Sequence, residues 1–249
     1  MLLVHGVLRE PDGRVLDRLD TGSIHPRVVA AGGLAAAVSE APDSGLTADD
    51  ALAHLDLLVA LAADVPVLPL PLGTTAPDDD AVREEMLTPA ADRLEQQLAA
   101  VADLVEVRLD IAFDTDALVA DVRRGDPSIE RLAARSRAPG AGFSERMALG
   151  EAVAARVADV EASLLEEWTA ELTSIAERVV VLTADEQVRR TAFCLRREHL
   201  PEADDAVESL RSAAAGRAGV EYVGPLPLYS FLDDPPPAHE PAPRSRWGW

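Results

Sequence analysis

Lysine and asparagine are absent from the 249-residue sequence, so all 23 basic residues are arginine. A chain without lysine cannot contain a G-x-x-x-x-G-K-[ST] phosphate-binding loop. The segment Gly140-Ala141-Gly142 lacks the downstream glycine of the G-x-G-x-x-G dinucleotide fingerprint. The sequence therefore gives no support for nucleotide binding by either of these routes.

Cysteine occurs once, at Cys194, and an internal disulfide is therefore impossible. Long apolar runs are also missing, since even the run at residues 57–63 stops at Asp64, well short of the roughly 20 residues of a membrane span. The mostly apolar N-terminal stretch reaches Arg9 and Glu10 too early for a secretory signal peptide. We therefore expect a cytoplasmic protein.

Basic residues are scarce relative to acidic ones: 44 Asp and Glu against 23 Arg give a formal net charge of -21. Nucleic acids and anionic lipids bind through Arg and Lys patches, so both partner classes are disfavoured. Residues 123–137 are a local exception, with five arginines against Asp126 and Glu130: Arg123, Arg124, Arg131, Arg135 and Arg137. This segment could grip an acidic partner, and the alternative is a solvated loop near its own acidic helices.

No arrangement of side chains predicts catalysis, a cofactor or a metal. The five histidines are scattered, without a pair spaced to place two metal ligands on one helix face. Cys194 lies in an apolar run and is interpreted as a small buried hydrophobe. Adjacent carboxylates such as Glu84-Glu85 and Glu166-Glu167 point in different directions along a helix. We expect a protein that is not an enzyme.

The length favours two domains, which we place at residues 1–104 and 105–232. The first domain begins with a strand at Leu2–Leu8 and a second apolar run at 34–38. Thr47 is an N-cap candidate for a helix whose apolar face is Leu52, Leu55, Val59 and Ala62, and which ends at Pro66. A short Pro-containing strand and a helical region interrupted at Pro89 complete this domain.

The second domain opens with the clearest strand, residues 105–113, where apolar residues alternate without fault. A long helix at 144–177, two strands, a helix from Pro201 and a last strand follow. The order β-α-β-β-α-β predicts a ferredoxin-like α+β domain, whose free sheet face would carry Glu106, Arg108 and Asp110. We interpret the first domain as a modified relative.

Two segments are expected to lie outside the packed elements. Residues 123–142 are rich in Gly, Pro and Ser, which predicts a mobile connection with at most a short helix. Residues 233–249 contain five prolines and few aliphatic residues, which predicts a disordered tail.

The strongest local signal is the octet that follows the last strand: Gly224, Pro225, Leu226, Pro227, Leu228, Tyr229, Ser230 and Phe231. Each proline restricts the residue before it, so the chain should leave the sheet extended and then bury Tyr229 and Phe231 on a shared face. The same residues could instead form an exposed docking strip for a partner.

This octet resembles the closing motif of the gas vesicle protein F/L family (GvpF/GvpL), commonly written G-P-W-P-P-Y-S-F. Two further segments match in the family's order: residues 2–7, and residues 67–74, which include Pro69 and Gly73. Leu226 and Leu228 replace a Trp and a Pro of the closing motif, and Pro71-Leu72 stand where the family commonly has Arg-Phe.

The resemblance implies an accessory or minor structural protein of the gas vesicle. Such a protein would bind the hydrophobic shell protein, and other accessory proteins as further partners, and would limit shell-protein aggregation during nucleation. It also implies an α+β N-terminal domain joined to a ferredoxin-like C-terminal domain, without catalysis. The alternative is a ligand-sensing or enzymatic ferredoxin-like protein with an interdomain pocket.

Overall fold

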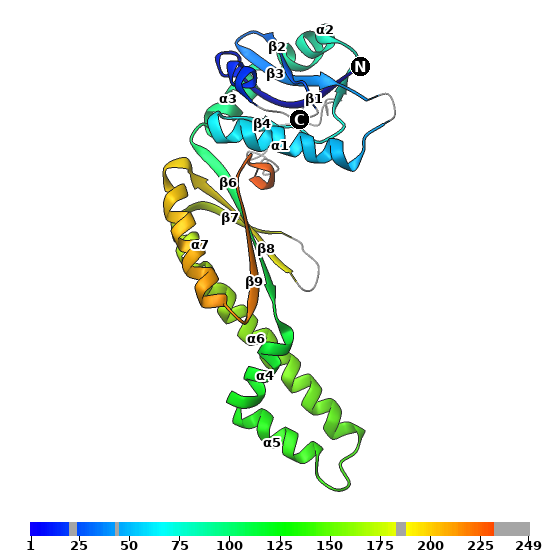
Figure 1. Ribbon diagram of the computed structural model, residues 1–249, viewed down its shortest axis with the longest axis vertical. Coiled ribbons are helices and arrows are strands. Elements are labelled where there is room, and N and C mark those ends of the chain that lie inside the picture. Colours follow the sequence, from blue (N-terminus) through cyan, green and yellow to red (C-terminus); the bar gives the residue numbers. More distant parts are fainter. Residues whose placement is uncertain (20–23, 43–44, 183–187, 232–249) are drawn as a thin grey trace. The chain divides into compact units, whose positions relative to one another are not determined.

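The computed structural model describes residues 1–19, 24–42, 45–182 and 188–231 (Figure 1). The fold is mixed α+β with two sheets, which confirms the predicted class. The chain divides into two compact units. Among the described residues, the first unit contains Met1–Arg108, Cys194–Glu198 and residues 223–231, and the second contains Leu109–Phe193 and His199–Tyr222. The boundary at residue 104 stays a prediction, and the tail at 233–249 lies outside the described residues.

The first sheet is antiparallel and has β1 near its centre, in the order β2-β3-β1-β4, with β5 also paired to β1. Its strands are β1 (Leu2–Arg9), β2 (Arg27–Ala31), β3 (Leu34–Glu40), β4 (Leu68–Pro69) and β5 (Thr75–Ala76). A 3-10 segment, η1 (Glu10–Arg18), follows β1. Strand β2, which was not predicted from the sequence, pairs with β3 across a tight turn at Gly32 and Gly33. Both glycines have positive φ, at 61° and 86°.

Helices cover the two faces of this sheet. α1 (Ala48–Asp64) lies on one side, while the other side carries α2 (Asp79–Ala81), η2 (Val82–Leu87), η3 (Thr88–Ala90) and α3 (Ala91–Ala100). Strand β3 shows the division, because Ala35 and Ala37 pack with α1, while Ala36 and Val38 pack with η2 and α3. This alternation is the period of a strand buried on both faces.

Helix α1 begins where the sequence predicts, at the Thr47 N-cap, whose side chain accepts the Asp50 N–H in a capping box. Of the predicted apolar face, only Ala62 is buried. The buried positions are His54, Leu57, Leu58, Leu61 and Ala62. Leu52 and Leu55 are 60% and 40% exposed, because α1 is apolar on two faces and only one of them meets the sheet.

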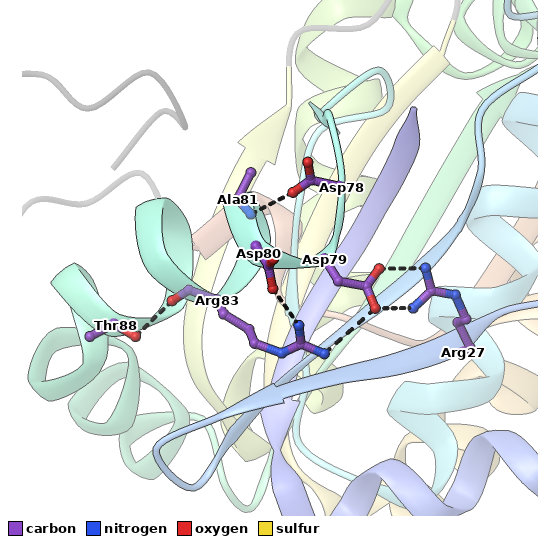
Figure 2. Close-up of polar contacts among 7 residues, drawn as sticks. All are labelled: Arg27, Asp78, Asp79, Asp80, Ala81, Arg83 and Thr88. Carbon is purple, nitrogen blue, oxygen red and sulfur yellow. Dashed lines mark hydrogen bonds and ion pairs between the residues drawn. The ribbon is translucent and has the colours of Figure 1, made fainter.

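An ion-pair cluster joins strand β2 to α2 at the surface (Figure 2). The Arg27 guanidinium donates to both carboxylate oxygens of Asp79, at 3.0 and 2.6 Å. These hydrogen bonds lower the pKa of the Asp79 carboxyl. Asp78 caps the helix by accepting the Ala81 N–H at 2.9 Å, so the acidic run 78–80 fixes the start of this helical region.

The second sheet has the order β7-β8-β6-β9. Its strands are β6 (Leu104–Phe113), β7 (Ala176–Leu182), β8 (Val188–Arg196) and β9 (Ala218–Leu226). The helices are α4 (Thr115–Gly125), α5 (Pro127–Ser136), α6 (Phe143–Ile175) and α7 (Leu200–Ala214), with single 3-10 turns η4 (Arg197–His199) and η5 (Tyr229–Phe231). Three helices rather than one separate β6 from β7, and the ferredoxin-like description stays a prediction.

The expectation of at most a short helix at 123–142 was wrong, because α4 and α5 occupy most of this segment. Asp126 caps α5 by accepting the Ser128 N–H at 2.8 Å, and Pro127 occupies the first turn. Buried Val122 and Ile129 then pack with Val157 of α6. The apolar residues are few, but the capping signal and this small core are sufficient for two helices.

Candidate functional site

The closing octet leaves β9 at Leu226 and ends in η5, the 3-10 turn Tyr229–Phe231. At its start, Gly224 lies directly against Val107 of β6: a Cβ added to Gly224 would be 2.7 Å from Val107 Cγ1. No residue with a side chain fits without a shift. The Gly224–Pro225 peptide is cis, and Leu226 and Leu228 are buried.

The two aromatic residues of the octet are held in different surroundings. Phe231 is buried, whereas Tyr229 is half-buried and packs with the α1 core. The prediction of a shared face in an extended segment was wrong, because residues two apart point in different directions in a 3-10 turn.

Between these aromatics, Ser230 is bound to a buried carboxylate. The Ser230 amide and hydroxyl donate to the two oxygens of Glu106, each at 2.8 Å, and Arg108 Nη2 donates to Glu106 Oε1 at 3.2 Å. Glu106 is fully buried. The expectation that Glu106, Arg108 and Asp110 form a free polar face was therefore wrong: in the second unit, the single Nε–H of Arg190 is shared between both carboxylate oxygens of Asp110, each 2.8 Å away.

Tyr229 lies next to a buried pair of histidines, His5 and His54. From the sequence, these two had been interpreted as scattered single residues. The Tyr229 hydroxyl lies 3.4 Å from His54 Nε2 on α1. His54 Nδ1 lies 2.8 Å from His5 Nδ1, and His5 Nε2 lies 2.8 Å from Ser39 Oγ on β3. The register between β1 and β3 shifts between Val4 and Gly6, so His5 is the extra residue of a bulge.

These groups are uncharged at neutral pH. Burial, with a contribution from His54, lowers the pKa of His5 to about 4, and burial lowers the pKa of His54 as well. Burial and the nearby Glu106 charge raise the pKa of Tyr229 to about 12. Neutral imidazoles can donate through one nitrogen and accept through the other, which satisfies a shared Nδ1–H···Nδ1 bond. The network is thus a chain of neutral hydrogen-bonding groups.

The middle motif, residues 67–74, also lies beside His5. Pro69 in β4 lies opposite Gly6 of β1, and the Leu70 N–H donates to the His5 carbonyl at 2.9 Å. Gly73 has a φ of 90° and follows in the turn that returns the chain to β1. The three segments that carry the family resemblance therefore converge on His5 and its neighbours, within the first unit.

The other polar groups in the described residues give little indication of a catalytic or metal site. No group of three or more His, Cys, Asp and Glu in this part of the chain could hold a metal ion. Cys194 is buried in β8, as predicted for a small core residue. The described residues contain no helix long and apolar enough to cross a membrane.

A second feature of the first unit is apolar. Leu52, Leu55 and Val59 follow one another along the outer face of α1, and we call these residues the α1 stripe. The first two are exposed and the third is half-buried. Exposed apolar residues that recur along one helix face are typical of an interaction surface.

Solved structures define the class of fold. The chain resembles the crystal structure of gas vesicle protein GvpF from Anabaena sp. PCC7120, with a TM-score of 0.75 and 18% identity over 92% of this chain and 97% of that one. It also resembles GvpF from Microcystis aeruginosa, with a TM-score of 0.69 and 18% identity over 92% of this chain and 98% of that one. At these identities the likeness establishes the fold alone.

Sequence comparisons identify the family. Residues 2–233 match the family described as gas vesicle synthesis protein GvpL/GvpF. Gas vesicle protein F of Streptomyces sp. (strain CB03234) is 32% identical over 213 residues, covering 83% of this chain and 87% of the relative. Gas vesicle protein F of Microcystis aeruginosa (strain PCC 7806) is 21% identical over 238 residues, covering 92% and 97%. The chain belongs to the GvpL/GvpF family, which supports a gas-vesicle-related role.

Proposed function

We propose that this protein is a non-enzymatic accessory protein of gas vesicle assembly, which binds the hydrophobic shell protein and limits its aggregation during nucleation. Family membership supports the gas vesicle role. The observation that carries the binding proposal is the α1 stripe, where Leu52 is 60% exposed although the opposite face of the same helix is packed in the core.

The charge of the chain supports the second half of the proposal. A formal net charge of -21 gives a complex with an apolar partner strong mutual repulsion, which opposes further association. The same charge disfavours nucleic acid and lipid membranes as partners. The protein thus combines an exposed apolar helix face with a strongly acidic overall charge.

The test is light scattering of freshly diluted shell protein, with and without a molar equivalent of this chain. The proposal expects delayed and reduced scattering in the presence of the chain. Serum albumin at the same concentration is the control for a non-specific protein effect. Scattering that is unchanged, or that albumin suppresses equally, would contradict the proposal.

We further propose that the family-motif residues are structural rather than a docking strip: Pro69, Gly73, Gly224, Pro225, Pro227, Tyr229, Ser230 and Phe231. Three contacts support this role. Gly224 abuts Val107, Ser230 is bound to the buried Glu106, and Tyr229 approaches His54. Groups held in this way are poorly available to a partner.

A further inference from the structure

A groove of about 560 Å³ lies between α4 and α6 in the second unit. Its apolar lining comes from Val119 of α4 and from three residues of α6, Leu149, Val153 and Val157. Val157 is buried, while the other three are half-buried. The groove therefore offers apolar surface that the two helices do not cover for each other.

The α6 side of the groove is shaped by small residues. Gly150, Ala154 and Ala158 line it at four-residue spacing, so they lie along one face of the helix, and all three are exposed. Met147 and Phe143 precede them at three- and four-residue steps and are 47% and 71% exposed. Small residues let a neighbouring helix approach closely, and larger apolar residues at the end add contact area.

The charge at the groove is opposite to that of the chain. Arg123 and Arg146 both line it and are exposed, and neither forms an ion pair with a carboxylate in the described ranges. The one acidic residue of the lining, Glu161, is bound by Arg189 at 3.1 Å. Arg146 also donates to the Ala141 carbonyl at 3.5 Å, and its charge interacts with the neighbouring Glu145 carboxylate. Two exposed guanidinium groups beside an apolar floor favour a partner with carboxylates flanking an apolar stripe.

We propose that the groove between α4 and α6 binds an acidic amphipathic helix of a partner protein. The apolar face of that helix lies over Val153 and the small residues of α6, and its flanking carboxylates pair with Arg123 and Arg146. Arginine suits this role because its guanidinium binds carboxylates through two parallel hydrogen bonds. The groove belongs to the second unit and shares no residue with the α1 stripe of the first unit, which is proposed to bind the shell protein.

The probe is a fluorescent synthetic amphipathic helix of about 18 residues, long enough to form several turns, with leucines on one face and glutamates beside them. A matched peptide carries lysine in place of every glutamate. Anisotropy titrations with the full chain at low salt should show that the glutamate peptide binds at least tenfold more tightly than the lysine peptide. The double variant R123E/R146E should reverse this preference.

Two further variants distinguish binding in the groove from a non-specific effect of positive charge on peptide binding. Ala154→Phe fills the groove from an exposed position and should weaken the binding of the glutamate peptide at least tenfold. Circular dichroism checks that the fold of this variant is intact. R131E/R135E removes the same charge from α5, outside the groove lining, and should bind like the wild type. Shell-protein capture by all these variants should stay unchanged, so the two proposals can fail independently.

Several results would overturn the proposal. They are equal binding of both peptides, no binding of the glutamate peptide, and equal weakening by R123E/R146E and R131E/R135E. Sedimentation of the chain alone tests another occupant: a dimer that Ala154→Phe dissociates would show that a second copy fills the groove. A loss of shell-protein capture in Ala154→Phe would assign the groove to the shell protein instead.

Discussion

Glu106 and Ser230 are 124 residues apart in the sequence, and both oxygens of the buried Glu106 carboxylate accept hydrogen bonds from Ser230. Burying a carboxylate is costly unless it is well hydrogen-bonded, so this pair fixes the end of the described chain to β6. The Arg108 guanidinium contributes a third bond, although its buried Nε has no partner among the described residues. The polar residues of the octet therefore hold the chain path after β9.

Removing the Glu106 charge should destabilise the fold. Glu106→Gln keeps the side-chain size but weakens the charge-assisted hydrogen bonds, and we expect a loss of about 1.5–3 kcal/mol in the free energy of unfolding by urea. Ser230→Ala removes only the hydroxyl bond and should cost about 0.5–1.5 kcal/mol. Equal stability of Glu106→Gln and the wild type would show that the pair is not important for the fold.

Gly224→Ala should be destabilising because the new methyl group overlaps Val107. Overpacking of this kind typically costs about 1–3 kcal/mol, measured by urea unfolding. A second substitution, Val107→Ala, removes the overlapping carbon, so the double variant should be more stable than the sum of the single effects. Gly125→Ala is the control, since nothing lies within 4 Å of its added Cβ. Additive effects at positions 224 and 107 would contradict the contact.

The histidine pair predicts a pH dependence of stability. Because the pKa of folded His5 is about 4 and that of His54 is also lowered, the unfolded chain binds more protons than the folded one below the ordinary value of 6.5. The full stability should therefore be present above about pH 6.5. Below it, the titration of His5 should lower the stability by up to about 1.4 kcal/mol per pH unit down to about pH 4, and His54 should add a further loss.

The pH dependence is best tested by differences between variants. In urea unfolding from pH 7 to 4, H5Q/H54Q should have a flatter slope than the wild type, because both titrating groups are gone. His25→Gln, at an exposed position, should retain the wild-type slope. If H5Q/H54Q and His25→Gln have the same slope, the assignment of the pH dependence to the buried pair is wrong.

Phe231 and Tyr229 distinguish a structural octet from a docking strip. Phe231→Ala should cost about 3–5 kcal/mol in unfolding free energy, because it leaves a cavity in the core. Tyr229→Phe removes only the hydroxyl near His54 and should cost about 1 kcal/mol or less. Shell-protein capture should be lost only where the fold is lost. Variants that stay stable but no longer capture the shell protein would make the octet the binding site.

The sequence predicts those parts of the fold that local physics determines. Alternating residues placed β6 correctly, the Thr47 cap placed the start of α1, and Pro89 lies in η3, where the helical region is interrupted. The features that the sequence did not predict depend on tertiary packing. The face of α1 that is buried depends on which side meets the sheet, and Leu52 and Leu57 are equally apolar in the sequence.

For the same reason, the sequence predicted only part of the candidate site. The octet, Pro69 and Gly73 were identified by their resemblance to the family motifs, but Glu106 and His54 were not identified as site residues. A glutamate in an alternating strand is usually solvated, whereas the buried Glu106 is bound by Ser230, which returns to it from a distant part of the chain. His54 lies outside the apolar face that was predicted for α1, and a contact with His5 across 49 positions has no local signature.

The most direct test of the proposed function is shell-protein capture by the α1-stripe variant L52D/L55D. Both leucines are exposed, so the free energy of unfolding should change by only about 0.5 kcal/mol. Capture measured by pull-down and light scattering should fall at least tenfold, because two apolar contacts are replaced by charge. The control is Val181→Asp on β7, which changes an equally apolar residue that is 77% exposed and should leave capture unchanged. Full capture by a stable L52D/L55D protein would contradict the account.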